Sequence, residues 1–246
     1  MNLKINLYIK ILIMLILPYL IYAKDFYSYE YNIILKQYTK SSKFKNISYI
    51  GIDYKNQRVK TLISKVVNQI QNFDLQQLNT RQEKLAFYIN LYNIYVIYII
   101  TQNYPLTSIM DLGKNIFDKK IVNIKNYTYS LNEIEHTIIR KNFHEPRIHF
   151  ALVCGAISCP DIRTELYTGK KLNYQLENQT KIFLSLNKGL YIENNVLHLS
   201  SLFNWYKEDF GNSNSHILKF IKRYRNIKNI EEIKFIPYYW DLNIIR

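Results

Sequence analysis

A long apolar segment at residues 81–102 constrains the fold of this chain more than any other feature. It is apolar on nearly all sides, so it predicts a helix at the centre of a hydrophobic core. Asn90 and Asn93 interrupt the segment three residues apart and therefore share one face. Buried amides need hydrogen-bond partners. We expect these two to tie the helix to a neighbouring loop, to hold the cysteine-containing loop at 154–159, or to bind substrate as oxyanion donors.

Other patterns place helices and strands on both sides of this segment. Helices are predicted at residues 25–40, 57–73, 174–186 and 217–224, and a strand at 48–54. Asn194 and Asn195 suit a turn with positive φ, which predicts a hairpin over 189–200. Because the predicted helices and strands do not alternate as βαβ units, we expect an α+β fold. A helical N-terminal region, residues 24–80, would pack on a mixed α+β core, residues 81–246.

The region before the cysteines has a clear helix start. Ser130 and Glu133 form a capping box, which predicts a helix carrying Glu135 and His136 one turn inside its first residue. Residues 107–129 before it are expected to be loop and short strand. The apolar run at 148–154, which Gly and Pro follow, predicts a buried strand.

The first residues have the order of a secretory signal peptide. A short positive region precedes an apolar stretch, and Ala23 ends it with a small residue. We expect cleavage after residue 23 and a secreted or exported chain, periplasmic or extracellular. The alternative is an uncleaved membrane anchor, and only in that case do we expect a membrane partner.

The charge is strongly basic but not clustered. The chain has 33 Lys and Arg against 19 Asp and Glu, a formal net charge of +14. Clustered basic residues would favour nucleic acid, but no block of five or six like charges occurs. Lys, Asn, Ile and Tyr are frequent throughout, which is typical of a codon-composition bias. A nucleic-acid partner is therefore not expected, although a basic binder remains an alternative.

Several blocks of residues carry a resemblance to a known family. In chain order they are KLAFYINLYN, SLNEIEH, EPRIHFALVCGAISCP, FNWYKEDFG and YYWDLN. Together they resemble the domain of unknown function 547 (DUF547) family, over residues 29–246. The resemblance implies a helical N-terminal region and an α+β core that has been compared with papain-like thiol hydrolases in a rearranged chain order. It implies no settled reaction, because a fold alone does not supply one.

The chain has the residue types that a thiol hydrolase needs. Such an enzyme uses a thiolate, a base that takes its proton, and a group that orients the base. On an ideal strand at 148–154, His149 and Cys154 would point to opposite faces. Cys159 lies in a turn before Pro160, which suits the first position of a helix, and a helix N-terminus stabilises a thiolate. Cys159 is therefore the preferred nucleophile, with Cys154 as second candidate.

The base and its orienting group are chosen from the preceding segment. His149 is the expected base and Glu135 its orienter, with His136 as alternative base. Consecutive helix residues do not face each other, so Glu135 is not expected to orient His136. Glu135 would instead pair with His149 or with Arg147. Arg147 is also a candidate substrate-binding residue, together with Asn90 and Asn93.

Structural roles for the same residues stay open. The two cysteines could be small buried residues or form a disulfide, and His149 could be a hydrogen-bonded core residue. Zinc binding by both cysteines, His136 and His149 is chemically possible. The Cys-x4-Cys spacing is loose for a zinc site, and the sequence has no second pair of ligands to complete it. No metal or cofactor is therefore expected. The FNWYKEDF block is expected to be a core corner, with Glu208 and Asp209 solvated or capping.

The sequence therefore predicts an exported α+β protein of uncharacterised family. The hypothesis for its activity is a thiol-dependent hydrolase or acyl transferase whose substrate is a peptide or an acyl compound with an amide or ester bond. The alternative is a non-catalytic binding or scaffold module, supported by the many aromatic residues and the basic surface.

Overall fold

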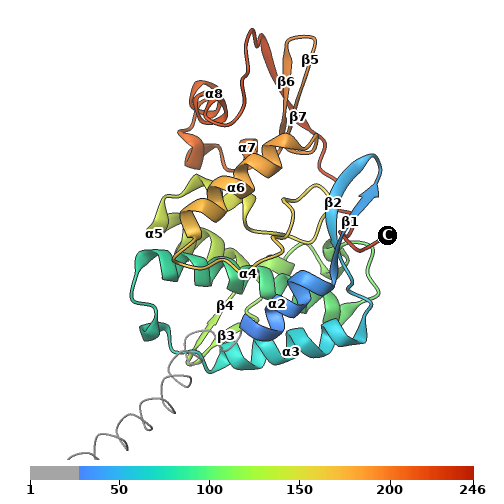
Figure 1. The fold of residues 1–246 in the computed structure, drawn as a ribbon, viewed down its shortest axis with the longest axis vertical. Helices are drawn as coiled ribbons and strands as arrows, with labels where there is room; N and C mark the ends of the chain where they lie inside the picture. Colours follow the sequence, from blue (N-terminus) through green and yellow to red (C-terminus); the bar gives the residue numbers. More distant parts are fainter. Residues whose placement is uncertain (1–27) are drawn as a thin grey trace, which may run out of the picture.

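The computed structural model describes residues 28–246, which form an α+β protein, as predicted (Figure 1). The predicted signal peptide lies outside the described residues and stays a prediction. The α-helices are α2 (Ser28–Gln37), α3 (Gln57–Gln71), α4 (Arg81–Asn103), α5 (Lys141–Phe143), α6 (Leu172–Ser185), α7 (Leu202–Trp205) and α8 (Asn214–Lys222). The predicted helices at 57–73, 81–102, 174–186 and 217–224 are confirmed, with shifted ends.

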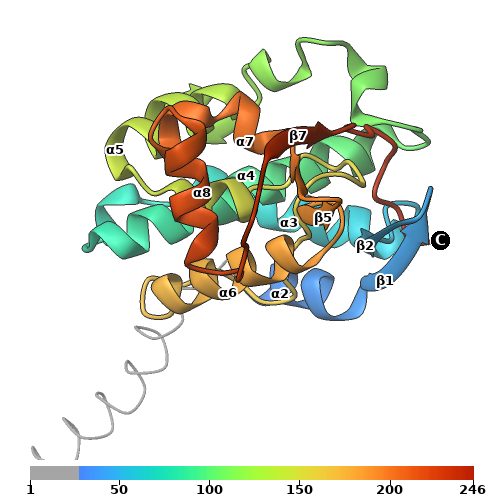
Figure 2. The same cartoon turned by 90° about the horizontal axis from the view of Figure 1, so that it is seen from above.

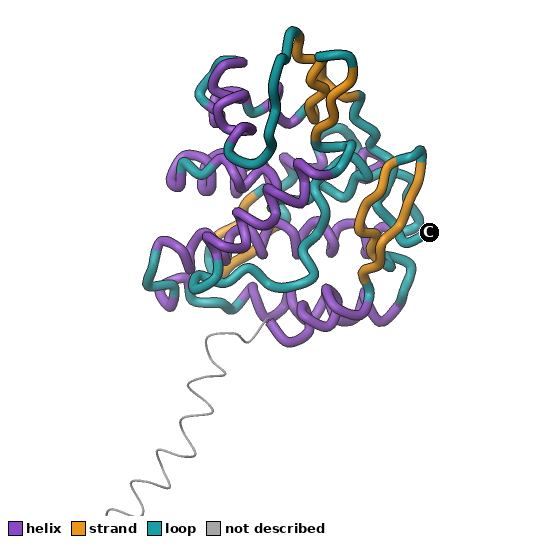
Figure 3. The backbone as a smooth tube through the Cα atoms, turned by 45° about the horizontal axis from the view of Figure 1, so that its top comes forward, coloured by secondary structure: helices purple, strands orange, loops and turns teal. Residues whose placement is uncertain are grey.

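The strands form small, separate sheets (Figure 3). They are β1 (Thr39–Phe44), β2 (Ile47–Ile52), β3 (Val122–Ile124), β4 (Tyr127–Tyr129), β5 (Leu190–Glu193), β6 (Val196–Ser200) and β7 (Glu232–Ile236). The predicted 189–200 hairpin is the antiparallel pair β5–β6, and its turn residues Asn194 and Asn195 have φ of 49° and 61°. β7 joins β6 in parallel after α7 and α8, a pairing that the sequence did not predict.

Helix α4 lies at the centre of the larger core, as predicted. Thr80 and Glu83 form a capping box at its start. Its length and composition would suit a membrane span, but 83% of its most apolar window is buried inside the protein. It is therefore the core helix of a folded unit; α3 packs beside it, and α2 packs against α3 (Figure 1).

The buried residues form two clusters. The α4 cluster joins α2, α3 and α4 with the segments that follow, as far as Leu176 in the first half of α6, and with Leu242 near the C-terminus. The phenylalanine cluster is smaller and lies among α6, α7, α8 and the β5–β6–β7 sheet. Its buried members are Phe150, Phe183, Leu184, Leu190, Leu197, Leu199, Leu202, Phe203, Phe210, Ile217, Phe220, Ile221 and Ile227. Seen from above, α7, α8 and β7 lie in front of α4 (Figure 2).

The predicted strand at 148–154 is wrong. Pro146–Phe150 is a 3-10 helix, and Glu145 caps it by accepting a hydrogen bond from the Arg147 amide. The following residues form an irregular buried segment whose backbone is bound by Asn93. The apolar run therefore reflects burial on all sides, and burial alone does not specify a strand.

The helix expected at Pro160 is also absent. Among the described residues, the next helix after Pro160 is α6, which begins at Leu172. Side-chain amides bind the backbone of the intervening loop: Gln179 donates to the Asp161 carbonyl at 2.6 Å and Gln175 to the Leu166 carbonyl at 2.7 Å. These bonds satisfy buried carbonyls that would otherwise need a helix or water. Within residues 28–246, the helix N-terminus expected directly after Cys159 is therefore absent.

The predicted capping box at Ser130 and Glu133 is confirmed. The Glu133 amide donates to the Ser130 hydroxyl at 3.1 Å, and the Ser130 amide donates to the Glu133 carboxylate at 2.8 Å. The helix that follows is wide: Glu133–Arg140 is a π-helix that continues into α5. π-helical turns are rare in proteins, and those that occur are often found at functional sites.

Candidate active site

A pocket of about 260 Å³ lies where the two clusters meet. It is lined by Tyr92, Phe117, Asn132, Glu135, His149, Leu152, Cys154, Cys159, Pro160, Leu202, Trp205, Tyr206, Tyr238 and Trp240. Both cysteines, His149 and Glu135 thus line one pocket. A larger cavity of about 380 Å³ beside the β1–β2 hairpin has neither Cys nor His among its described lining residues.

Helix α4 positions the chain just before Cys154. The Asn93 side chain donates to the Ala151 carbonyl and accepts from the Val153 amide, both at 2.9 Å. Gly155 follows with a φ of +85°, a left-handed conformation that favours glycine. A Cβ there would lie 2.6 Å from the Ile100 side chain of α4. The cysteine loop therefore sits directly against the core helix.

The C-terminal segment holds the other side of the cysteine loop. The Ile157 amide donates to the Asp241 carbonyl at 2.8 Å, and the Asn243 amide donates to the Gly155 carbonyl at 2.9 Å. The Tyr239 amide donates to the Ser158 hydroxyl at 2.9 Å. A segment more than 80 residues away thus fixes this loop, and it also brings Tyr238 and Trp240 to the pocket.

The two thiols are free and differ in exposure. Cys154 is half-buried, whereas Cys159 is buried. The Cys154 amide donates to the Cys159 sulfur at 2.8 Å, and the Tyr238 hydroxyl lies 3.1 Å from the Cys154 sulfur. The Cys159 sulfur therefore accepts a hydrogen bond from the Cys154 backbone, and the hydroxyl of the pocket-lining Tyr238 contacts the Cys154 sulfur.

These contacts favour Cys154 as the thiolate. Burial raises the pKa of the Cys154 thiol, but hydrogen bonds from Cys159, Tyr238 and the Ala156 amide lower it more, so the net pKa lies below the ordinary value. Burial and the neighbouring Cys154 raise the pKa of Cys159 well above the ordinary value. The thiolate is the nucleophilic form, so these pKa shifts favour Cys154 over Cys159 as the candidate nucleophile.

His149 is fixed by Asp209. Its Nε2 lies 2.6 Å from an Asp209 carboxylate oxygen, while its Nδ1 lies 3.9 Å from the Glu135 carboxylate. The ring stacks on Tyr206 with centroids 3.9 Å apart. The close hydrogen bond sets the orientation of an imidazole, so Asp209 rather than Glu135 fixes the orientation of this ring.

Asp209, expected from the sequence to be solvated or capping, instead contacts the pocket-lining His149. Arg140 binds both of its oxygens, at 2.6 and 3.0 Å. Burial raises the pKa of Asp209, but the hydrogen bonds from His149 and Arg140 lower it more, so its pKa lies well below the usual value. The sequence feature that could have identified Asp209 is its place in the FNWYKEDFG block, one of the blocks that carry the family resemblance.

Glu135 lies deeper than Asp209. Its side chain is 6% exposed and comes from the π-helix. Tyr206 hydrogen bonds to Glu135, and burial with this neighbouring carboxylate raises the pKa of the Tyr206 phenol. Tyr206 therefore keeps its proton and donates. The predicted proximity of Glu135 to His149 is found, at a distance longer than a hydrogen bond.

His136 is turned away from this arrangement. Its Nδ1 lies 2.9 Å from the Arg140 guanidinium, and His136 is not among the residues that line the pocket. Its predicted role as alternative base has no support from this position.

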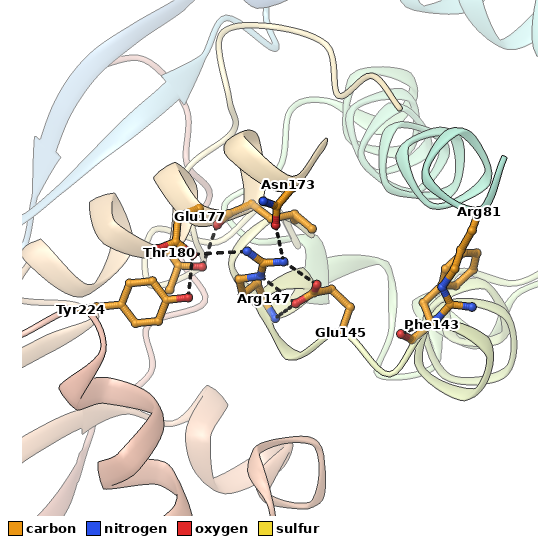
Figure 4. Close-up of polar contacts among 9 residues, drawn as sticks. Arg81, Phe143, Glu145, Arg147, Asn173, Glu177, Thr180 and Tyr224 are labelled. Atoms are coloured by element: carbon orange, nitrogen blue, oxygen red, sulfur yellow. Dashed lines mark hydrogen bonds and ion pairs between the residues drawn. The ribbon is translucent and has the colours of Figure 1, made fainter. Parts of the chain in front are cut away.

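The three residues expected to bind substrate have structural contacts instead. Asn90 donates to the Tyr167 carbonyl at 2.7 Å and accepts from the Tyr167 amide at 3.1 Å. Arg147 binds Glu145, Glu177 and Asn173, not Glu135 (Figure 4). Neither Arg147 nor the two asparagines line the pocket. Asn93 binds the backbone of Ala151 and Val153, directly before the cysteine loop, so it ties α4 to a neighbouring segment.

Trp205, Tyr238 and Trp240 form an aromatic wall of the pocket; of these, only Trp205 belongs to the block that was predicted to be a core corner. The ring centroids of Trp205 and Tyr238 are 4.8 Å apart, and those of Tyr238 and Trp240 are 4.9 Å apart. Trp205 is 48% exposed, so it borders the opening. Phe203 and Phe210 of the same block do lie in the phenylalanine cluster.

Within residues 28–246, no group of three or more His, Cys, Asp and Glu side chains has the geometry of a metal site. The lining of the pocket instead combines one thiol of lowered pKa, one oriented imidazole and an aromatic wall.

Comparison with known proteins gives one match. The model of a family described as a protein of unknown function, DUF547, matches residues 75–184. This match over residues 75–184 supports an assignment to the DUF547 family. Searches of curated proteins and of solved structures gave no match. The comparison with papain-like hydrolases therefore stays a prediction.

The DUF547 match contains only part of the pocket. Cys154, Cys159, His149 and Glu135 lie inside the matched residues, whereas Asp209 and Tyr238 follow them. The later part of the chain thus supplies the group that orients His149 and the hydroxyl that contacts Cys154.

Proposed function

We propose that this DUF547 protein is a cysteine-dependent hydrolase or acyl transferase that acts on an amide or ester. Cys154 is the nucleophile, His149 the base and Asp209 the group that orients the base. The observation that carries the proposal is the difference between the two thiols: the half-buried one lies on the pocket with a lowered pKa and a hydroxyl donor at 3.1 Å.

Each group has a defined role in this reaction. The Cys154 sulfur attacks the carbonyl carbon, and His149 Nδ1 takes the thiol proton. His149 returns that proton to the leaving group as the carbon–heteroatom bond breaks, which leaves a thioester. Water or an acceptor nucleophile then releases the acyl group. Asp209 holds Nε2 throughout, which leaves Nδ1, 3.9 Å from the pocket-lining Glu135, to exchange the proton.

The test compares two cysteine variants on 4-nitrophenyl esters of short acyl chains. With the wild type we expect a burst of about one nitrophenolate per protein and an acyl adduct on Cys154 by mass spectrometry. Cys154→Ala should lose both. Cys159→Ala should keep turnover but raise the pH midpoint of Cys154 alkylation by iodoacetamide, because it removes a hydrogen-bond donor.

Turnover that survives in Cys154→Ala would contradict the proposal. Full alkylation of Cys154 without turnover of any ester or amide would contradict it as well and would leave a non-catalytic binding module. His149→Ala separates the roles further, since loss of a general base costs about 10²–10⁴ in rate while the thiol remains.

A further inference from the structure

The charges around the pocket do not cancel. Arg140 binds Asp209 through two hydrogen bonds, so this pair is formally neutral. A proton moved from Cys154 to His149 leaves their summed charge unchanged. Glu135 then remains as one formal negative charge on the pocket wall.

No basic side chain offsets this charge from the wall. Among the described residues that line the pocket there is no Lys and no Arg, although the whole chain has a formal net charge of +14. Arg140 is not among the lining residues; it lies 5.2 Å from the Tyr206 ring centroid and interacts electrostatically with both Asp209 and Glu135. One cation outside the lining thus faces two carboxylates, so an anionic substrate would meet an excess of negative charge.

The aromatic wall has the chemistry that complements a cation. Trp205 and Trp240 are nearly parallel, with an interplanar angle of 19°, and Tyr238 is tilted by 53° and 54° to them. Ring faces attract ammonium groups, with tryptophan the strongest, and aromatic cages bind quaternary ammonium ligands in this way. Tyr238 also contacts the Cys154 sulfur, so the wall begins beside the reacting atom.

We propose that the pocket selects an amide or ester that carries a cationic ammonium group, bound against Trp205, Tyr238 and Trp240 near the Glu135 carboxylate. The selection as a substrate preference rests on the proposed function, but the ammonium site itself does not require turnover. A pocket of about 260 Å³ is smaller than most drug-sized ligand sites. The group it takes is therefore compact, such as a trimethylammonium.

The experiment uses two alcohols of the same shape. Choline carries a trimethylammonium group, and 3,3-dimethylbutan-1-ol has carbon in place of its nitrogen. Each is titrated against the rate at which iodoacetamide alkylates Cys154 in the full protein, with the modified cysteine identified by peptide mass spectrometry. We expect choline to protect Cys154 at about one tenth of the concentration that the neutral alcohol needs.

Variants assign the effect to the proposed groups. Glu135→Gln removes the charge but keeps an acceptor for Tyr206, and it should reduce the preference for choline. Trp205→Leu alters a half-exposed ring and should weaken choline protection more than protection by the neutral alcohol. Glu208→Gln is the matched control, because it removes the same charge from an exposed neighbour of Asp209 outside the pocket.

Equal protection by the two alcohols, or better protection by the neutral one, would overturn the ammonium site. A choline preference that survives both Glu135→Gln and Trp205→Leu would overturn its assignment to these residues. A choline preference without ester turnover would instead overturn the proposed function and leave the site standing.

Discussion

The α4 cluster and the phenylalanine cluster differ in how they hold the site. The first is built from long helices whose side-chain amides bind loop backbone, as Asn93 binds the segment before Cys154. The second is built from stacked rings around Phe150, which contacts Phe183 and Phe210. Both clusters are packed apolar cores, but the first also binds loop backbone through directional side-chain hydrogen bonds.

The proposed nucleophile and base are divided between these clusters. Cys154 packs against the α4 cluster. His149 stacks on Tyr206 of the phenylalanine cluster, and its partner Asp209 precedes Phe210 of that cluster. The relative position of the two clusters therefore sets the geometry of the site. Substitutions in one cluster should affect one reacting group more than the other.

The largest effect is expected at Phe150. Phe150→Ala removes a fully buried ring and should lower the free energy of unfolding by about 4 kcal/mol in urea titrations. Hydrogen exchange should rise mainly at residues 183–227. Phe87→Ala, a buried ring on α4, should cost a similar amount but raise exchange at residues 57–100.

Phe150→Leu provides a milder variant if the alanine variant does not fold. Uniformly raised exchange in both the Phe150 and Phe87 variants would show that the clusters open as one unit, and the proposed division of the site would then be wrong.

A smaller effect is expected at Asn93. Asn93→Ala leaves the Ala151 carbonyl and the Val153 amide without their partner, and each buried unpaired group costs about 1–3 kcal/mol. We expect a loss of about 3 kcal/mol and a changed rate of Cys154 alkylation. Asn90→Ala is the matched control: it should cost a similar amount without changing that rate, since Asn90 binds Tyr167. An equal change in both variants would contradict the positioning role of Asn93.

Helices could be predicted where apolar residues recur at helical spacing or where a capping box marks the first turn. α3 repeats apolar residues at helical spacing, and the Ser130–Glu133 capping box marks a helix start through contacts between residues close in sequence. The run at 148–154 has no period, so its apolar composition could not distinguish a strand from a buried turn. Asn93, about 60 residues away, decides its path.

The candidate site was predictable only as a set of residue types. Cys154, Cys159, His149 and Glu135 were named from the sequence and do line one pocket. Their ranking depended on long-range contacts that no local pattern encodes. Asp209 lies 60 positions from His149, and Tyr238 lies 84 positions from Cys154.

The smallest of these effects is expected at Asp209. Hydrogen bonds from His149 and Arg140 outweigh burial and hold the pKa of Asp209 below its unfolded-state value of about 3.9. Its stabilising contribution is therefore present above pH ~4 and is lost as pH falls through the folded-state pKa. Asp209→Asn should lower the free energy of unfolding by about 2 kcal/mol at pH 7, and the difference from wild type should shrink below pH ~4.

Urea titrations at pH 7, 4 and 3 measure this difference, and Glu208→Gln is the control for removing one carboxylate beside it. Glu208 is exposed, so its variant should change stability by less than about 0.5 kcal/mol at every pH. A cost for Asp209→Asn that stays constant from pH 7 to 3 would mean that the carboxylate is not stabilised by its charged partners.

Because Asp209 holds His149 and not Cys154, the variant should lose turnover while the pH midpoint of Cys154 alkylation stays near that of the wild type.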